Sequence, residues 1–494
     1  MKEGKMKKET NVTLVTVAIF IATFMSAIEG TIVSTAMPTI VGDLHGMNLM
    51  NWIFSIYLLT NAMLTPIYGK LADRVGRKSV FIVGLLLFII GSALCGFAQN
   101  MMTLIIFRAL QGMGAGAILP LSFTIIADIY PIEKRAKILG FNSSAWGIAS
   151  VVAPLLGGFI VEQLSWHWIF FINVPIGLIT IWMISHYLNE PKREVIKAPI
   201  DYRGSLFLML TLLCVMYGFQ VLEHGFSLVL VLMFVIAIIC FLLFIKTEKT
   251  ATDPIISLAL FKNRTFNVQN LVAALVSGFL MGFEVYMPMW MQGILGLPAS
   301  MGGFVVTPSS LMWVVASFIT GGLLAKYTPR FILFWSLALL ACGSFVLAVL
   351  PETTSFSTFL IVAAFLGLGF GVTITTTTVV SQNSVSKDQI GVATSFNTLC
   401  RTLGQTLMVS VYGIILNLHL ASGVAKYKHS GITSDMMNRL VNPQTATSLP
   451  AKLLPTLREI LYSGLHVIYM TSVILMILAI IVNLFGKRKK VVEQ

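Results

Sequence analysis

The chain has 494 residues, of which 56% are hydrophobic and only 11% are charged, and its mean hydropathy is +0.88. These values lie far outside the range of soluble globular domains and predict a polytopic membrane protein. The formal net charge of +13 would suit a nucleic-acid partner, but the positions of the basic residues exclude one.

Apolar runs of about 20 residues, long enough to cross the hydrocarbon layer as helices, recur along the chain. Because these runs are continuous and do not alternate with polar residues, they predict an all-α membrane protein and not a barrel. The fourteen predicted spans are 12–37, 51–69, 79–98, 101–126, 138–163, 166–187, 204–222, 226–246, 267–290, 299–325, 329–350, 357–384, 390–418 and 464–486.

Lysine and arginine are concentrated in the segments that would lie on one side of the membrane. If the N-terminus is cytoplasmic, the outside loops hold none of them except the long 419–463 segment. This bias follows the positive-inside rule and predicts a multi-pass protein of the cell (plasma) membrane with both termini in the cytoplasm. The first span is too long, and lacks the small-residue cleavage site, for a removable signal peptide. The cysteines show no disulfide or metal spacing, so we expect neither a metal nor a cofactor.

The first span contains a glutamate, Glu29, although the segment from Asn11 to Gly42 contains no Lys, Arg or His. A partner for this acid must therefore come from elsewhere in the fold or from solution. Arg108 and Gln111 in the fourth span lie three residues apart and share one helix face. Unpaired and unhydrated charges inside a membrane cost about 2.5–3.5 kcal/mol each, so the buried charges predict a hydrated, charge-compensated cavity; a purely structural ion pair is the alternative.

Three sequence echoes recur at an offset of 251 to 255 residues and predict an internal duplication. The same offset takes Glu29 to Glu284, and we expect both acids to face one central cavity, although a chance match is the alternative. The echoes pair Gly69 with Gly322, Gly112-Met-Gly-Ala-Gly116 with Gly367-Leu-Gly-Phe-Gly371, and Gly140 with Gly391. The predicted domains are a six-helix bundle at 1–187, a cytoplasmic linker at 188–203, two inserted helices at 204–246, a cytoplasmic amphipathic segment at 247–266, and a second six-helix bundle at 267–494 with an extracellular loop near 419–463.

Four stretches together resemble the signature motifs of the major facilitator superfamily, and with fourteen spans they resemble its fourteen-helix drug:proton antiporter branch. The resemblance covers essentially the whole chain and implies two pseudo-symmetric six-helix bundles plus two inserted helices. The stretches are Gly69-Lys-Leu-Ala-Asp-Arg-Val-Gly-Arg-Lys78, Leu104-Ile-Ile-Phe-Arg-Ala-Leu-Gln-Gly-Met-Gly114, Gly147-Ile-Ala-Ser-Val-Val-Ala-Pro-Leu-Leu-Gly-Gly158 and Trp166-His-Trp-Ile-Phe-Phe-Ile-Asn-Val-Pro-Ile-Gly177.

The chain departs from the branch at three positions. Glu29 stands where the branch usually has aspartate, in a pattern that here ends Ala-Met-Pro38 and usually ends Ala-Leu-Pro. Ala153 replaces the usual glycine before Pro154, and His167 replaces the arginine common between the two tryptophans. The first departure concerns substrate preference more than membership of the family.

The resemblance assigns the first motif to a conformational latch, in which the acid of the loop meets the start of the thirteenth span. Here that start reads Ser386-Lys-Asp-Gln389, a possible capping box whose helix dipole would attract Asp73. A basic loop that only orients the protein in the membrane is the alternative. The latch residues are Gly69, Asp73, Arg74, Gly76 and Arg77.

By resemblance, the third motif is the antiporter motif, and it favours export over symport. Its residues Gly147, Pro154, Gly157 and Gly158 also allow close helix approach and a kink in the helix. A role in helix packing alone is therefore the alternative. For proton coupling we select Glu29, Glu284 and Arg108. The candidate cavity residues are Met25, Gln111, Asn142, Trp146, Tyr286, Asn397 and Arg401, although the aromatic and methionine side chains suit lipid-facing packing equally well.

The predicted function is proton-coupled antiport that exports lipophilic, cationic drugs by alternating access, with the proton gradient as energy source. A carboxyl group deprived of water holds its proton to higher pH, so proton and cation would compete for Glu29. Two acids also permit electrogenic exchange. The predicted partners are a small lipophilic substrate, protons and membrane lipid, without nucleic acid; an accessory protein stays open.

Two other functions are compatible with the fold class. One is a dedicated exporter of a metabolite, a lipid-like compound or an antimicrobial peptide. The other is a membrane enzyme or sensor, but the chain has neither a phosphate-binding Gly-x-x-x-x-Gly-Lys-Ser/Thr loop nor a His-Glu-x-x-His motif. We therefore expect a transporter and not an enzyme.

Overall fold

The computed structural model describes residues 10–130, 132–190, 201–222, 227–251, 258–385 and 390–486. This described part is helical, without strands. Its α-helices are α1 (Val12–Leu44), α2 (Met50–Val75), α3 (Arg77–Gly96), α4 (Met101–Ile129), α5 (Ile132–Gln163), α6 (Trp168–Phe171), α7 (Asn173–Tyr187), α8 (Tyr202–Leu222), α9 (Leu228–Thr250), α10 (Arg264–Met289), α11 (Ala299–Phe304), α12 (Thr307–Lys326), α13 (Pro329–Val349), α14 (Phe356–Asn383), α15 (Ile390–Lys426), α16 (Ser434–Val441), α17 (Pro443–Ala446) and α18 (Leu454–Leu484). Short elements add η1 (Met47–Leu49), η2 (Leu258–Lys262), the π-helical η3 (Trp290–Ile294) and η5 (Lys428–Ser430).

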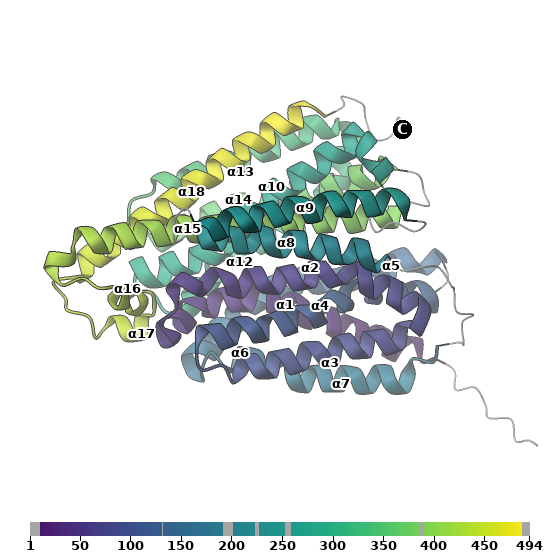
Figure 1. Ribbon diagram of the computed structural model, residues 1–494, viewed down its shortest axis with the longest axis horizontal. Coiled ribbons are helices and arrows are strands. Elements are labelled where there is room, and N and C mark those ends of the chain that lie inside the picture. The colour runs from purple at the N-terminus through teal and green to yellow at the C-terminus, as the bar shows by residue number, and fades with distance from the viewer. Residues whose placement is uncertain are drawn as a thin grey trace, which may run out of the picture.

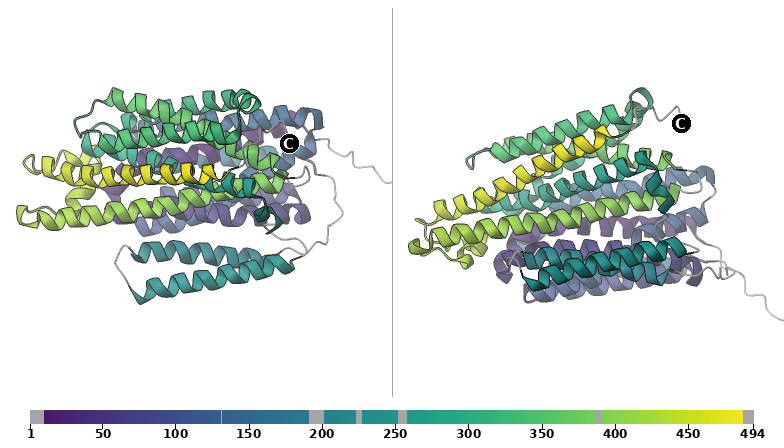
Figure 2. Two further views of the ribbon diagram at one scale, coloured as in Figure 1. Left: turned by 90° about the horizontal axis from the view of Figure 1, so that it is seen from above. Right: turned by 45° about the horizontal axis from the view of Figure 1, so that its top comes forward.

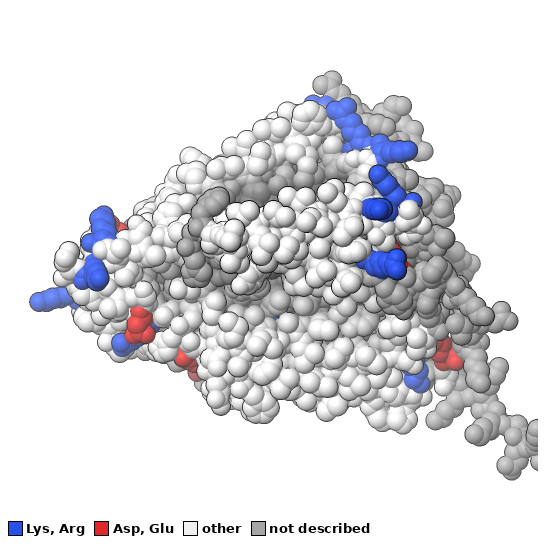
Figure 3. All heavy atoms as spheres, in the orientation of Figure 1, with Lys and Arg blue, Asp and Glu red and all other residues white. Residues whose placement is uncertain are grey.

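The long helices run along the long axis of the molecule and alternate in direction (Figure 1). We call the end with α16, α17 and the α1–α2 connection the α16 end, and the opposite end, where α2 and α3 meet at Gly76, the α3 end. The α2–α3 turn needs glycine because Gly76 has φ 103°, which side chains disfavour. On the face shown in Figure 3, lysine and arginine lie at the two ends and leave the sides of the molecule uncharged, as a membrane-embedded belt requires.

Twelve helices in the described part are long and apolar enough to cross a membrane. The two predicted spans that fall short are helical in the structure, as α2 and α8. α2 carries Asn51, Ser55 and Asn61 among its apolar residues, and the apolar stretch of α8, Arg203–Phe219, is shorter than a full span. The multi-pass all-helical architecture is thus established, whereas the count of fourteen spans is not confirmed.

Two predicted spans contain a break in the helix. The span at 166–187 includes α6 and α7, and the span at 299–325 includes α11 and α12, but each remains one apolar span, Trp168–Tyr187 and Ala299–Lys326. The last predicted span, 464–486, begins earlier than expected, because α18 continues without a break from Leu454 to Leu484. Of the amphipathic segment at 247–266, residues 252–257 lie outside the described part, and η2 follows them. The described part of the linker at 188–203 ends at Glu190 and resumes at Asp201.

The duplication appears in the packing of the two glycine runs. In α4, glycines press against the backbones of α2 and α3, and in α14 the matching glycines press against α12 and α13, because any side chain would collide there. The neighbours correspond at nearly the same offset as the glycines themselves. Gly112 packs on Tyr57, Gly116 on Asn61 and Gly114 on Phe88, while Gly367 packs on Ser309, Gly371 on Trp313 and Gly369 on Leu340.

The helices form two groups, which we call the N-terminal group (α1–α7) and the C-terminal group (α10–α18). Within them, α1 packs on α4, α5 and α7, and α10 packs on α14, α15 and α18. The α8–α9 hairpin lies along the outside, where α8 contacts α2 and α15 (Figure 2). α13 and α18 diverge from α3 and α7 toward the α3 end (Figure 1).

Hydrogen bonds between the two groups gather at the α16 end. One link is the Tyr286 hydroxyl, which donates to Asn51 Oδ1 at 2.6 Å. The further links join Gln292 to Thr35, Ser300 to Glu162, Asn417 to Asn48, Met47 to Asn438, Asn442 to Asp43 and His45 to Asp435. The two groups are therefore tied together at one end of the molecule.

Candidate functional site

Glu29 lies near the middle of α1 with no exposed surface. One carboxylate oxygen, Oε1, forms an ion pair with Arg108 of α4, and the other, Oε2, accepts a hydrogen bond of 2.7 Å from Asn173 Nδ2 of α7. A carboxylate without water needs such partners on both oxygens, since an isolated buried charge costs far more than a hydrogen bond returns. The partner that the sequence required for Glu29 is thus Arg108, and it comes from the same group of helices.

Arg108 has several neutral partners in addition to Glu29. Its Nη1 donates to Gln111 Oε1 at 2.7 Å, its Nε donates to the Ile53 carbonyl at 3.3 Å, and its guanidinium lies 4.1 Å from the centre of the Tyr57 ring. These contacts from α2 and α4 satisfy a cation that is only 1% exposed. Arg108 therefore keeps stabilising contacts when the charge of Glu29 is removed.

Ser92 of α3 connects the remaining polar groups. Its hydroxyl donates to the Phe170 carbonyl at 2.8 Å and accepts from Gln111 Nε2 at 3.1 Å and from Asn173 Nδ2 at 2.9 Å. We call Glu29, Ser92, Arg108, Gln111 and Asn173 the acid cluster. All five side chains are buried, and their hydrogen bonds join α1, α3, α4 and α7 into one network.

Glu284 has a different environment. It is partly exposed on α10, and Arg401 on α15 interacts with it electrostatically. In the part of the chain that the structure describes, the two side chains form no ion pair or hydrogen bond with each other. The Nε atom of Arg401 is buried there without a partner.

Glu29 and Glu284 share no partner among the described residues. The partners of Glu29 all belong to the N-terminal group, whereas Glu284 lies beside Arg401 in the C-terminal group. The expectation that both face one hydrated central cavity does not describe this conformation, because Glu29 is enclosed by its own helices. The sequence could not show this, since an offset locates a residue on a helix and not the direction of its side chain.

The other candidate cavity residues occupy varied positions. Met25 is buried one turn before Glu29, and Tyr286 bonds Asn51 across the two groups. Asn397 donates to Asn270 at 2.9 Å, so its amide is used inside the C-terminal group. Asn142 is 1% exposed and both its polar side-chain atoms lack partners among the described residues, while Trp146 is 44% exposed.

The antiporter motif lies at the junction of the two groups. A Cβ atom on Gly158 would lie 2.3 Å from Cα of Ser300, and one on Gly157 would lie 2.8 Å from the Ile32 side chain. A Cβ on Gly303 of α11 would lie 2.2 Å from the carbonyl oxygen of Pro154. Close packing of α5 on α1 and α11 depends on these positions, whereas a Cβ atom on Gly147 would lie 3.1 Å from the Val314 side chain.

The predicted latch is described in part. Gly69 faces open space and Gly76 makes the α2–α3 turn. The side chains of Asp73 and Arg74, together with the segment 386–389, lie outside the described residues. Arg77 forms an ion pair with Asp128 of α4, and its Nη1 donates to the Thr124 carbonyl at 2.7 Å.

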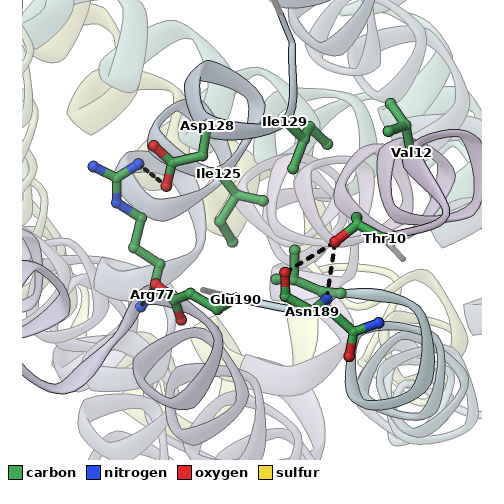
Figure 4. Close-up of a pocket in the computed structure, with 9 residues that line it drawn as sticks. Thr10, Val12, Arg77, Ile125, Asp128, Ile129, Asn189 and Glu190 are labelled. Atoms are coloured by element: carbon green, nitrogen blue, oxygen red, sulfur yellow. Dashed lines mark hydrogen bonds and ion pairs between the residues drawn. The ribbon is translucent and has the colours of Figure 1, made fainter. Parts of the chain in front are cut away.

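A cavity of about 300 Å³ opens beside Arg77 at the α3 end (Figure 4). Glu190, which lies in the predicted linker, accepts hydrogen bonds from the backbone N–H groups of Arg77 and Lys78 at 2.9 and 3.1 Å, and so caps α3. Thr10 donates to the Asn189 carbonyl at 2.9 Å on the opposite wall. The residues that line this cavity hold the α2–α3 turn in place, and none of them belongs to the acid cluster.

Sequence reasoning missed three members of the site. Asn173 belongs to a motif to which the sequence assigned no role for it, and Ser92 and Tyr57 were not selected as candidates. A polar residue within an apolar run, such as Ser92 or Asn173, is the only sequence feature that would have pointed to them.

Comparison with known proteins agrees with this architecture. The family model described as Major Facilitator Superfamily matches residues 19–409. The chain is 34% identical to the multidrug transporter protein MdtP of Bacillus subtilis over 98% of this chain and 94% of that protein. It is 33% identical to multidrug resistance protein 3 of the same organism, covering 98% and 97%.

A third relative, the multidrug efflux pump SdrM of Staphylococcus aureus, is 35% identical over 81% of this chain and 88% of that protein. Among solved structures, a bacterial homologue of the human lysosomal transporter Spinster, inward-facing and unoccupied, superposes with a TM-score of 0.69 at 16% identity over 96% of both chains. This likeness concerns the fold. The protein is a multi-pass membrane transporter and not an enzyme, and the chain belongs to the major facilitator superfamily.

Proposed function

We propose that this protein is a proton-driven exporter of lipophilic, cationic drugs, in which Glu29 carries the proton. The observation that carries the proposal is the buried ion pair of Glu29 and Arg108. Burying a titratable acid costs desolvation free energy, and acids kept at such a cost inside membrane proteins usually serve function. The curated relatives named as multidrug transporters support drugs as the cargo.

The enclosure of Glu29 couples its protonation to helix movement. Neither water nor cargo reaches the carboxylate while α3, α4 and α7 cover it, so α1 must shift before a proton is taken up or released. Protonation removes the charge that ties α1 to Arg108, and Gln111, Ile53 and Tyr57 then hold the guanidinium. The proton thereby lowers the cost of moving α1, and a cation that favours the charged carboxylate acts in the opposite direction.

We place the α3 end in the cytoplasm of a cell whose plasma membrane the protein spans, following the distribution of basic residues. In this orientation the ties at the α16 end close the outer side, and the conformation faces inward. Residues 1–187 and 267–494 form the two bundles, with α2 and α8 included among fourteen spans. No cofactor is required, since the proton gradient supplies the energy.

Transport in proteoliposomes tests the proposal, with tetraphenylphosphonium as a lipophilic monovalent cation. We expect an imposed pH gradient to drive its uptake against its concentration gradient by wild-type protein in the everted orientation. Glu29→Gln is expected to abolish this uptake. The proposal is wrong if the pH gradient drives uptake by the wild type neither of this probe nor of a panel of cationic dyes. It is also wrong if the double variant Glu29→Gln, Glu284→Gln keeps full activity.

A further inference from the structure

Asn173 is the first residue of α7 and is 2% exposed. Its side-chain nitrogen donates to Glu29 Oε2 at 2.7 Å and to Ser92 Oγ at 2.9 Å. An amide nitrogen has two hydrogens, so both are used. We infer that Asn173 is a positioning residue for the proton carrier, which holds Glu29 Oε2 as a charged acceptor and ties α1 to α7 until the proton arrives. The inference rests on the proposed function and adds a residue to it.

The chemistry of the contact makes it sensitive to the proton. While Glu29 is charged, Oε2 accepts from Asn173 and Oε1 accepts from Arg108. A proton on Oε2 would place an O–H donor against the N–H donor of Asn173, at a carboxyl group with no exposed surface. Hydrogen bonds to a charged acceptor are about twice as strong as neutral ones, so the contact is worth most in the deprotonated state.

The surroundings of Asn173 fix its direction. Ser92 donates to the carbonyl of Phe170, three residues before Asn173, and accepts from both Asn173 and Gln111. A hydroxyl has one donor and two acceptor positions, so Ser92 is fully used and holds the amide between α3 and α1. One turn further along α7, Gly177 packs near Met25 of α1. The face of α7 that touches α1 therefore includes the proton carrier and its support.

Infrared spectroscopy of the full-length protein in detergent tests the inference without any substrate. The C=O stretch of a protonated carboxyl group is followed over pH, and the band lost in Glu29→Gln identifies Glu29. In Asn173→Leu, which keeps the side-chain volume, we expect the midpoint of this band to move to higher pH by about one to two units, because the charged form has lost a strong donor. In Asn173→Asp, two neighbouring acids should titrate in two coupled steps.

Asn483→Leu is the matched control. Asn483 of α18 is also fully buried and donates to the Arg330 carbonyl at 2.9 Å, far from Glu29, so its removal should leave the midpoint unchanged. Ser92→Ala, which only loosens Asn173, should move the midpoint in the same direction by less. A midpoint in Asn173→Leu equal to that of the wild type overturns the inference; if that variant does not fold, an unchanged midpoint in Ser92→Ala does so.

The result is independent of whether protons drive transport. If the midpoints move as expected while a pH gradient drives no uptake of tetraphenylphosphonium, the proposed function fails and the role of Asn173 in holding Glu29 stands. If uptake depends on Glu29 and the midpoints do not move, the proposed function stands and Asn173 is a packing residue.

Discussion

Glu29 and Glu284 occupy matching positions in the two halves of the chain, 255 residues apart, yet their surroundings differ. Glu29 is fully buried, paired with Arg108 and bonded to Asn173. Glu284 is partly exposed, and its nearest opposite charge, Arg401, is not in contact with it. The two acids that the sequence offset pairs therefore have different local structures.

The arginines explain the difference. The offset that relates the two acids takes Arg108 to Ala363 of α14 and takes Arg401 back to Trp146 of α5. Each half thus contains one of these two arginines, and they lie on helices that do not correspond. Arg108 points into the N-terminal group and completes a closed ion pair, whereas Arg401 lies on the partly exposed side of α15. In this conformation Glu29 is enclosed and Glu284 is partly exposed.

The largest expected effect comes from Arg108→Ala. The substitution leaves Glu29 buried without its counter-charge, and breaking one side of a buried ion pair typically costs about 3–5 kcal/mol. We expect loss of transport and a clear drop in the thermal unfolding temperature in detergent. Arg401→Ala is the matched control, with a loss of about 1 kcal/mol or less for a charge that is not in direct contact. Equal losses in the two variants would contradict the contrast between the two regions.

A double variant separates charge from packing. Glu29→Gln with Arg108→Gln replaces the ion pair by neutral groups that hydrogen-bond, and such replacements of buried pairs are often close to neutral. We expect the double variant to recover most of the stability lost in Arg108→Ala, and to remain inactive because no proton carrier is left. Recovery of proton-driven uptake would show that Glu29 does not carry the proton.

Much of the fold follows from the sequence, but the acid cluster does not. Apolar run length and the repeated glycines predict helices and their pairing, because any side chain at Gly114 or Gly369 would collide with the next helix. The need for a partner to Glu29 also follows from charge alone. The choice of Asn173 and Ser92 as partners depends on the rotation of α3 and α7 about their axes, which three-dimensional packing decides. The break between α6 and α7 is hidden for the same reason, since both sides of it are apolar.

A smaller effect is expected from Gly303→Ala, which tests whether the exposure of Glu284 belongs to this conformation. The added Cβ would press on the Pro154 carbonyl at the α16 end, and such overpacking costs about 1–3 kcal/mol. We expect the two groups to separate more readily there. The rate at which a hydrophobic carbodiimide labels Glu284 should differ several-fold from that in the wild type. The labelling rate of Glu29, which is enclosed in one group, should stay unchanged. Gly322→Ala, where the new Cβ meets open space, is the control.

The smallest effect concerns the far end of the helix that carries Glu29. Asp43 of α1 accepts a hydrogen bond of 3.0 Å from Trp166 Nε1, and the ring of His167 stacks on Trp166 at 3.7 Å. Burial lowers the pKa of His167 below its usual value, and the nearby Asp43 only partly opposes this shift. The folded state therefore resists charging of the imidazole.

The lowered pKa of His167 determines how the stability of the protein changes with pH. Because the pKa of His167 is lower in the folded than in the unfolded protein, its contribution to stability is complete above about pH 6.5 and is lost as the pH falls below it. We expect the unfolding temperature of the wild type to decrease slightly more between pH 7.5 and pH 5.5 than that of His167→Gln. The comparison is best made in the Glu29→Gln background, where the main acid no longer titrates. An identical pH response in both proteins would show that the stability of the N-terminal group does not depend on the protonation of this imidazole.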